Sequence, residues 1–308
     1  MSVEPNEELR AAWLAKRRQG VSSSDIAAVC GLSPWGGALD VYLEKLGLVP
    51  PKKMTKEMEW GLLQERVIAA RYTYEEGREL TEPPPYTLVQ HPECAWWIAT
   101  PDRLAADRVV ELKTSRYERD PAGSVIWGEP GTDLVPIYYH LQVIWQMLVT
   151  GLPKGDIAVL IAGADFRVYH LEWNQEIINR LMEIADSFHD RVQRRDPPPV
   201  DWADPRATEL LEFLHSPEEG KKVELDESAV PFADQYQQLG RAIGDMEKSR
   251  QEAKGRLIEL MEDAQEGLLP DGRRVKRETC HRKGYMVEPK EYVDFRILKP
   301  KKERSKNE

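Results

Sequence analysis

Two carboxylates and a lysine lie in two short segments, each of which follows apolar residues. Asp102 closes the apolar run of residues 95–100 after one proline, while Glu111 and Lys113 follow the β-branched pair at 109–110. If these segments are the strands of one hairpin, both carboxylates and the ammonium group meet at one edge. Mg²⁺ prefers oxygen ligands and usually takes one or two carboxylates. A lysine beside the metal can orient or deprotonate an attacking water. The pattern indicates a hydrolytic metal site, the alternative being a surface hairpin with an ordinary Glu–Lys pair.

Two further polar side chains lie in segments that otherwise suit burial. Glu65 has apolar neighbours three and four positions away on a predicted helix, and Gln142 lies within the apolar helix expected over residues 137–150. A buried amide needs a hydrogen-bond partner, and at the active edge Gln142 would find water or phosphate. Glu65 either joins the site or pairs with Arg66 or Arg71 at the edge of the buried stripe.

A candidate anion pocket precedes these residues in the chain. Arg17 and Ser24 lie seven positions apart, and residues 23–25 offer capping side chains for a helix that runs to about residue 30. Arginine presents a planar fork to phosphate, serine adds a hydroxyl group, and a helix N-terminus adds backbone N–H groups. The three together suit a terminal phosphate. The alternative is that Ser24 only caps a helix and Arg17 is a surface charge.

The remaining pattern predicts a mixed α/β sheet flanked by helices. The long helix expected over residues 56–76 is amphipathic, with Trp60, Leu63, Val67 and Ala70 at helical spacing. Further helices are predicted at residues 38–46, 137–150 and 174–195, and strands at 86–90, 156–162 and 166–173. We predict that the domain built from these elements covers residues 1–200.

The composition changes near residue 201. Residues 204–214 and 233–265 are highly charged, and the second segment carries a sparse apolar stripe. Such a helix is mostly exposed and needs a partner, from this chain or another subunit, to cover its seam. Short strands are expected at 273–276 and 292–298. Residues 201–308 are therefore predicted to form a charged helical extension that ends in a basic tail.

The charge distribution leaves room for nucleic acid despite a net charge of −10. Residues 10–56 have a net charge of +5 and residues 270–308 one of +6, and DNA need be bound only locally. Cys30, Cys94 and Cys280 are too scattered for a disulfide framework or a zinc site. No apolar run reaches the ~20 residues that cross a bilayer, and no secretory signal is visible. We expect a cytoplasmic protein.

Taken in order, the motifs resemble the YqaJ-type viral recombinase family. This family includes the phage lambda-type exonucleases and belongs to the PD-(D/E)XK nucleases, and the resemblance covers about residues 10–195. The residues that carry it are Trp13, Leu14, Arg17, Gly20, Val21, Ser24, Asp25, Ile26, Ala27, the Gly31–Trp35 segment, the Tyr42–Lys45 segment with Gly47, Gly61, Glu65, Pro101, Asp102, Glu111, Leu112, Lys113, Gln142 and Val143.

The resemblance implies a restriction-endonuclease-like α/β core and a two-metal site. Asp102, Glu111 and the backbone carbonyl of Leu112 would bind Mg²⁺, which Mn²⁺ can replace. Glu65 would lie near the second ion, and Lys113 would activate or position the water.

Other matched residues imply contacts with DNA. Gln142 and Tyr139 match the helix beside the scissile phosphate, and Arg17 and Ser24 match the pair that holds the 5′ phosphate. Such enzymes degrade one strand of linear duplex DNA from its 5′ end and leave a 3′ overhang for a single-strand annealing protein. Lambda-type members are ring-shaped trimers. The residue pair 22–23 is Ser-Ser where relatives often have Gly-Gly. An endonuclease or nickase without an end requirement, or an inactive DNA-binding scaffold, is the alternative.

Overall fold

A four-stranded mixed sheet holds the segment with Glu111 and Lys113. Its strands are β4 (Arg103–Leu104), β5 (Arg108–Ser115), β6 (Lys154–Ile161) and β7 (Asp165–Glu172), in the order β4-β5-β6-β7. β5 runs parallel to β6, and both outer strands run antiparallel to their neighbours. The middle of β5 and β6 is almost continuously buried, as expected for strands covered on both faces. This sheet is described, with the rest of the chain, by a computed structural model covering residues 7–50, 54–119, 125–202, 205–215, 217–279 and 297.

A second, three-stranded sheet corrects the predicted hairpin. β3 (Cys94–Ala99) lies between β1 (Val21–Ser22) and β2 (Val89–His91), and it does not pair with β5. The partner of β5 is instead the two-residue strand β4, which is too short to show an apolar alternation in the sequence. The prediction of one hairpin was therefore wrong, but Asp102 still directly precedes the strand that pairs with β5.

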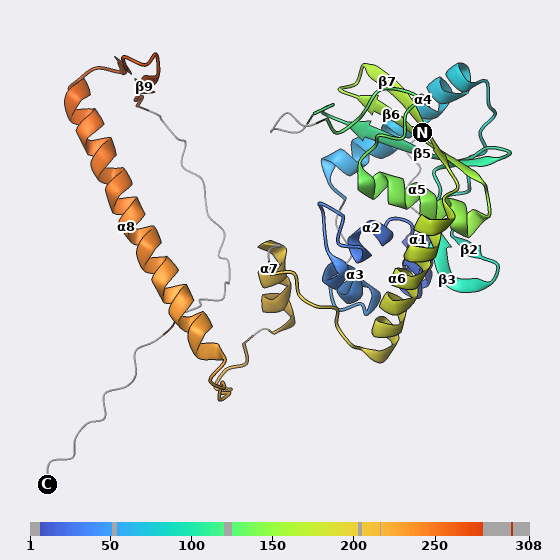
Figure 1. Ribbon diagram of the computed structural model, residues 1–308, viewed down its shortest axis with the longest axis horizontal. Coiled ribbons are helices and arrows are strands. Elements are labelled where there is room, and N and C mark those ends of the chain that lie inside the picture. The colour runs from blue at the N-terminus through green and yellow to red at the C-terminus, as the bar shows by residue number, and fades with distance from the viewer. Residues whose placement is uncertain are drawn as a thin grey trace, which may run out of the picture. The chain divides into compact units, whose positions relative to one another are not determined.

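Helices surround the sheets, and the mixed α/β fold predicted from the sequence is confirmed (Figure 1). α5 (Ile137–Thr150) packs against both sheets, and its Trp145 Nε1 donates to the carbonyl oxygen of Ile98 in β3 at 3.1 Å. Eight of its residues are buried. The other helices of this part of the chain are α1 (Glu7–Arg18), α2 (Ile26–Val29), α3 (Ala38–Lys45), α4 (Lys56–Glu76), α6 (Gln175–Arg194) and α7 (Pro205–Leu214).

Helix α4 has the bounds expected from the sequence, but the opposite face is buried. It begins after Thr55, whose hydroxyl accepts a hydrogen bond from the backbone N–H of Met58, and ends at a left-handed glycine. Trp60, Leu63 and Val67 are 61–62% exposed. The residues that face the sheet are Ile68, Ala69 and Tyr72. The helix has two apolar stripes, and the predicted stripe was the wrong one because spacing alone does not say which stripe meets the sheet.

The chain divides into two compact units, Met1–Leu214 and His215–Glu308. The second contains α8 (Ala229–Met261) and a hairpin of β8 (Glu266–Leu268) and β9 (Arg274–Lys276). The predicted basic tail and, apart from residue 297, the predicted strand at 292–298 lie outside the described residues. The functional boundary at residue 200 stays a prediction.

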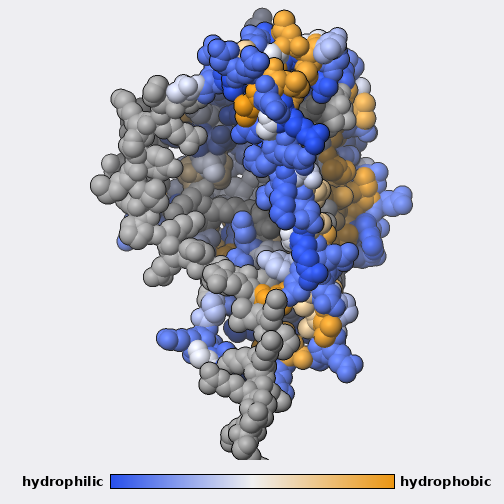
Figure 2. Space-filling view, turned by 90° about the vertical axis from the view of Figure 1, so that its left-hand side faces the viewer, coloured by the Kyte–Doolittle hydropathy of each residue, from blue (hydrophilic) through white to orange (hydrophobic). Residues whose placement is uncertain are grey.

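The surface reflects the high content of charged residues. In Figure 2, hydrophilic side chains make up most of the coloured surface, and hydrophobic side chains interrupt them in separate places. None of the described helices is long and apolar enough to cross a bilayer.

Candidate active site

Glu111 is the centre of a hydrogen-bonded cluster between β5 and α5. Its Oε1 accepts hydrogen bonds from Lys113 Nζ and Gln142 Nε2, and its Oε2 accepts one from Gln146 Nε2 at 2.7 Å. The residue is only 2% exposed. Alternation along β5 places Glu111 and Lys113 on the same face, and α5 covers that face with the two glutamines one turn apart. The carboxylate is thus held by three donors from two elements.

Lys113 lies among negative charge and an aromatic face. Besides Glu111, its ammonium group lies 4.8 Å from the centre of the Tyr139 ring, a cation–π arrangement. Burial alone would lower the pKa of Lys113, but the carboxylates of Glu111 and Asp102 raise it above its usual value. The side chain is therefore a protonated donor at neutral pH.

Asp102 and Glu65 complete a group of three carboxylates around this lysine. Asp102 Oδ2 accepts a hydrogen bond from the backbone N–H of Leu112 at 2.8 Å, which ties the residue to β5. Burial raises the pKa of Asp102 well above its usual range, and the negative charges of Glu111 and Glu65 raise it further. The positive charge of Lys113 opposes this shift. Burial also raises the pKa of Glu65, while Arg103, whose Nη1 lies 3.8 Å away, opposes the shift.

The donor set of this cluster fits a hard divalent cation. Three carboxylates face one ammonium group, so the cluster has an excess of negative charge. Mg²⁺ and Mn²⁺ prefer such oxygen ligands. In the described part of the chain, three acidic, histidine or cysteine residues have ligand atoms within 4.8 Å of one another only at Glu76, Asp156 and His170. The carboxylate oxygens of Asp102, Glu111 and Glu65 are therefore not all this close together.

That second group is better explained as a structural ion pair. Both oxygens of Asp156 accept hydrogen bonds from Arg108 Nη1, at 2.9 and 3.0 Å, and the Tyr72 hydroxyl donates to Oδ2. His170 Nδ1 lies 2.9 Å from Oδ1. Asp156 is fully buried, and an arginine already neutralises it. A metal ion there would have to displace that arginine.

Gln146 is a site residue that the sequence analysis missed. It is fully buried on α5, and its Oε1 has no hydrogen-bond partner among the described residues. Its position four residues after Gln142 was an available signal, since side chains at i and i+4 lie on the same helix face. Two glutamines so spaced in an apolar helix indicate a shared polar partner, which is Glu111.

Replacing Gln146 by leucine is expected to lower DNA hydrolysis about 10- to 100-fold, as typical for residues that orient metal ligands. The half-saturating Mg²⁺ concentration should rise, because Glu111 loses one of the donors that fix it. The unfolding free energy should change by less than about 1.5 kcal/mol, since the variant also removes an unpaired buried carbonyl. Met147→Leu is the matched control on the same buried helix. Equal Mg²⁺ dependence in the two variants would contradict a positioning role.

The structure brings Arg17 and Ser24 together, but in a separate cluster with two acidic residues. Arg17 Nη2 donates to Ser24 Oγ at 3.0 Å and to Asp25 Oδ1 at 2.7 Å, and Nη1 donates to Glu44 at 3.0 Å. Asp25 is buried and also accepts from Lys45 Nζ at 2.6 Å. Two positive and two negative charges leave this cluster without net positive charge. Only the hydroxyl of Ser24, an exposed residue, is available to an anion without breaking an ion pair.

As predicted, one of residues 23–25 is the N-cap of the following helix, but its side chain does not cap that helix. α2 has only four residues, and its N-cap, Asp25, makes no side-chain capping bond. Its carboxylate instead accepts from the backbone N–H and the hydroxyl of Ser22. The reason is Lys45 and Arg17, which draw the carboxylate inward. Among the described residues, no hydrogen bond or ion pair joins this cluster to that of Glu111.

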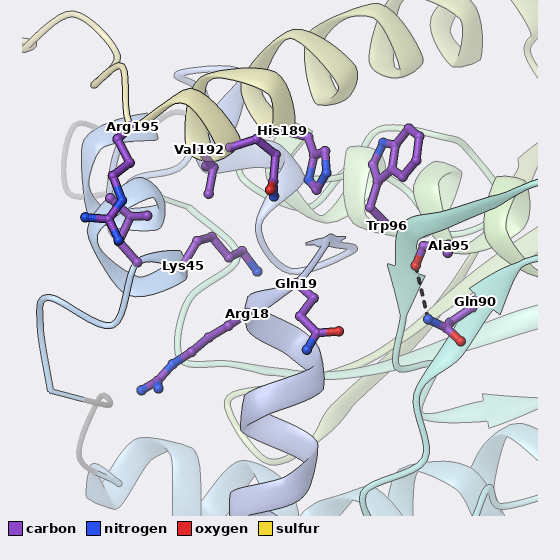
Figure 3. A pocket seen from close by; sticks show the side chains of 11 residues that line it. Arg18, Gln19, Lys45, Gln90, Ala95, Trp96, His189, Val192 and Arg195 are labelled. Atoms are coloured by element: carbon purple, nitrogen blue, oxygen red, sulfur yellow. Dashed lines mark hydrogen bonds between the residues drawn. The ribbon is translucent and has the colours of Figure 1, made fainter.

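A cavity of about 550 Å³ is lined in part by Lys45, and none of the predicted site residues lines it. Arg18 and Gln19 from the end of α1 and His189 from α6 line it, and the ring of Trp96 stacks on His189 with a centroid separation of 4.9 Å (Figure 3).

Comparisons with known proteins show which proteins this chain is similar to. The family model of the YqaJ-like viral recombinase domain matches residues 12–153. Protein YqaJ of Bacillus subtilis (strain 168) is 25% identical over 271 residues, covering 86% of this chain and 82% of its own. An uncharacterized protein of Acanthamoeba polyphaga mimivirus is 25% identical over 162 residues, covering 49% of this chain and 28% of its own. The solved structure of an alkaline exonuclease from Laribacter hongkongensis is 19% identical with a TM-score of 0.45, covering 65% of this chain and 99% of its own.

Proposed function

Because residues 12–153 belong to the YqaJ-like viral recombinase family, we propose that this protein is a metal-dependent DNA exonuclease. Its substrate would be linear double-stranded DNA, degraded from the 5′ end to leave 3′ single-stranded overhangs. The observation that carries the proposal is the group of Asp102, Glu111 and Glu65 around Lys113. The combination of several carboxylates with one lysine is the donor set that metal-assisted phosphodiester hydrolysis requires.

We assign metal binding to Asp102, Glu111, the Leu112 carbonyl oxygen and Glu65. When bound, Mg²⁺ or Mn²⁺, as two ions, would supply a nucleophilic water and stabilise charge on the phosphate oxygens. Gln142 and Gln146 hold Glu111 in place through hydrogen bonds to its two oxygens. Leu112 orients Asp102 in the same way through its backbone N–H.

Lys113 would stabilise the reacting phosphate as a fixed positive charge. Its ammonium group donates to Glu111 and lies over Tyr139, and a donor already oriented needs no reorganisation during the reaction. A protonated lysine positions the water and stabilises the growing negative charge, whereas general-base catalysis would need the neutral amine.

Recognition of the DNA end is assigned to Arg17 and Ser24, as the family resemblance implies. Phosphate would take the place of Glu44 at Arg17 and accept from the Ser24 hydroxyl group. Tyr139 would contact the strand near the scissile phosphate. The overhang would pass to a single-strand annealing protein. We propose a homo-oligomer, a trimer by resemblance, for the nuclease unit.

Digestion of end-labelled linear duplex in Mg²⁺ should be at least about tenfold faster with a 5′ phosphate than with a 5′ hydroxyl, because an arginine–phosphate contact is charge-assisted. Covalently closed plasmid should stay intact, and chelation of the metal should stop the reaction. Arg17→Gln should remove the preference for phosphate. Arg180→Gln, at an exposed ion pair on α6, is the matched control.

Each other result selects a different function. Cleavage of closed plasmid would indicate an endonuclease or nickase. Cleavage of linear DNA without preference for phosphate would remove the role of Arg17 and Ser24 and leave the nuclease proposal intact. Absence of cleavage in both Mg²⁺ and Mn²⁺, with DNA still bound, would indicate a recombination scaffold.

A further inference from the structure

Helix α8 carries a seam of side chains that recur alternately every three and four residues. A spacing that averages 3.5 residues keeps one seam facing a partner helix, which is the pattern of a coiled coil. The seam residues are Phe232, Tyr236, Leu239, Ile243, Met246, Arg250, Ala253, Leu257 and Leu260.

The middle of this seam is exposed within its own unit. Leu239, Ile243 and Met246 are 55%, 53% and 63% exposed. The β8–β9 hairpin lies against the C-terminal end of the helix, where Met261 is buried beside Gly267. Each glycine inside a helix costs roughly 0.5–1 kcal/mol relative to alanine, and α8 has three. Packing against a partner helix would therefore stabilise this 33-residue helix.

The single charged residue of the seam, Arg250, argues against a parallel pair of identical helices. In parallel register each seam residue faces its own copy, so two Arg250 guanidinium groups would meet between the helices. An antiparallel pair avoids this contact. In the antiparallel register with full overlap, Leu239 faces Arg250 of the second copy, and the aliphatic part of the arginine can pack on the leucine.

The same antiparallel register brings compatible side chains together in the middle of the seam. Ile243 faces Met246 of the second copy near the centre of the pair. Toward the ends, Tyr236 faces Ala253 of the second copy, so the largest side chain of the middle region meets the smallest. Large side chains opposite small ones are what close packing requires.

The residues that flank the seam also agree with this register. The pairs that face each other across the two helices are Gln235 with Arg256, Ala242 with Ser249, Ala233 with Lys254 and Gly240 with Glu247. None of these pairs brings like charges together, and every long side chain meets a small or neutral one. The helix is thus complementary to its own reversed copy.

We propose that α8 forms an antiparallel coiled coil with α8 of a second copy of this chain. A 33-residue helix is about 50 Å long. If six large apolar side chains on each helix each bury roughly 100 Å², the pair buries roughly 1,200 Å², the lower end of the range for specific interfaces. The proposal does not depend on nuclease activity.

Disulfide trapping in the full chain tests the orientation. Gln235→Cys and Arg256→Cys together, in a Cys280→Ser background, should give a covalent dimer on oxidation. The two positions lie about 31 Å apart on one helix, so they cannot pair within a chain. Each single substitution serves as a control and should give no more dimer than the background protein. Failure of the double variant to form the dimer, or equally efficient trapping by a single variant, would overturn the antiparallel pair.

Light scattering of the full chain tests the pairing itself. Ile243→Glu places a charge in the centre of the seam and should halve the molar mass, whereas Gln251→Glu adds the same charge outside the seam and should leave it unchanged. An equal mass for the two variants would overturn the proposal. Neither measurement uses DNA or a metal ion, so failure here leaves the proposed nuclease activity untouched.

Discussion

Replacing Lys113 by alanine is expected to lower the rate of DNA hydrolysis about 100- to 1,000-fold, the usual effect of removing one fixed donor at a developing charge. The affinity for linear duplex should change by less than about threefold, because phosphate contacts spread over a DNA interface outnumber this one. Single-turnover cleavage of end-labelled duplex measures the rate, and fluorescence anisotropy measures binding.

The control is Lys154→Ala at the start of β6, where the ammonium group lies 3.7 Å from Asp107 on the surface. It removes the same charge from the same sheet without touching the carboxylate cluster. In Lys113→Ala, Glu111 keeps its bonds to Gln142 and Gln146, so the fold should persist. Near-normal turnover by Lys113→Ala would refute the assigned site.

Replacing Asp25 by asparagine is expected to lower the unfolding free energy by about 3–5 kcal/mol, the typical cost of removing one partner from a buried ion pair. Asp25 is buried, and the change leaves Lys45, whose side chain is 2% exposed, without its carboxylate. All nine tryptophans lie at or before residue 202. Urea unfolding followed by tryptophan fluorescence therefore reports on the unit that contains Asp25.

The loss of unfolding free energy caused by Asp25→Asn should become smaller at acidic pH. Burial alone would raise the pKa of Asp25, but Arg17, Lys45 and Ser22 together hold it well below its usual range. A carboxyl group with a lowered pKa stabilises the fold above its unfolded-state pKa of about 3.9, and this contribution falls as the pH drops toward the folded-state value. At pH 3 the difference in unfolding free energy between the unchanged protein and Asp25→Asn should be about 1 kcal/mol smaller than at pH 7. Glu183→Gln, at an exposed pair, should cost under about 1 kcal/mol, and an equal loss in both variants would contradict the role of Asp25.

Local signals in the sequence predicted the helices well. α4 and α5 have the predicted bounds because a capping threonine, terminal glycines and apolar periodicity all act within a few residues. Strand pairing depends on partners far away in the chain, and the sequence alone misjudged it. The Trp-rich strand β3 suited a hairpin with β5 as well as it suited its true partners.

The same contrast between local and long-range signals explains why only part of the candidate site was predicted. Asp102, Glu111, Lys113 and Gln142 carry chemistry in their residue types, and the structure gathers them. Gln146 went unnoticed because its importance depends on the carboxylate it faces. The ion pair of Arg17 with Glu44 could not be predicted from the sequence either, since the two residues are 27 positions apart and no fixed spacing reveals their contact.

The parallel pairing of β5 with β6 has a consequence for protein synthesis. All proposed metal ligands precede residue 113. Before β6 has been synthesised, the only strand that can pair with β5 is the two-residue β4. The sheet is complete only when β6, which begins at Lys154, pairs with β5 and β7 pairs with β6. A chain still on the ribosome that has not yet exposed these strands carries every reactive side chain without the sheet that assembles them. The proposed nuclease activity would therefore arise only after most of the first unit has left the ribosome.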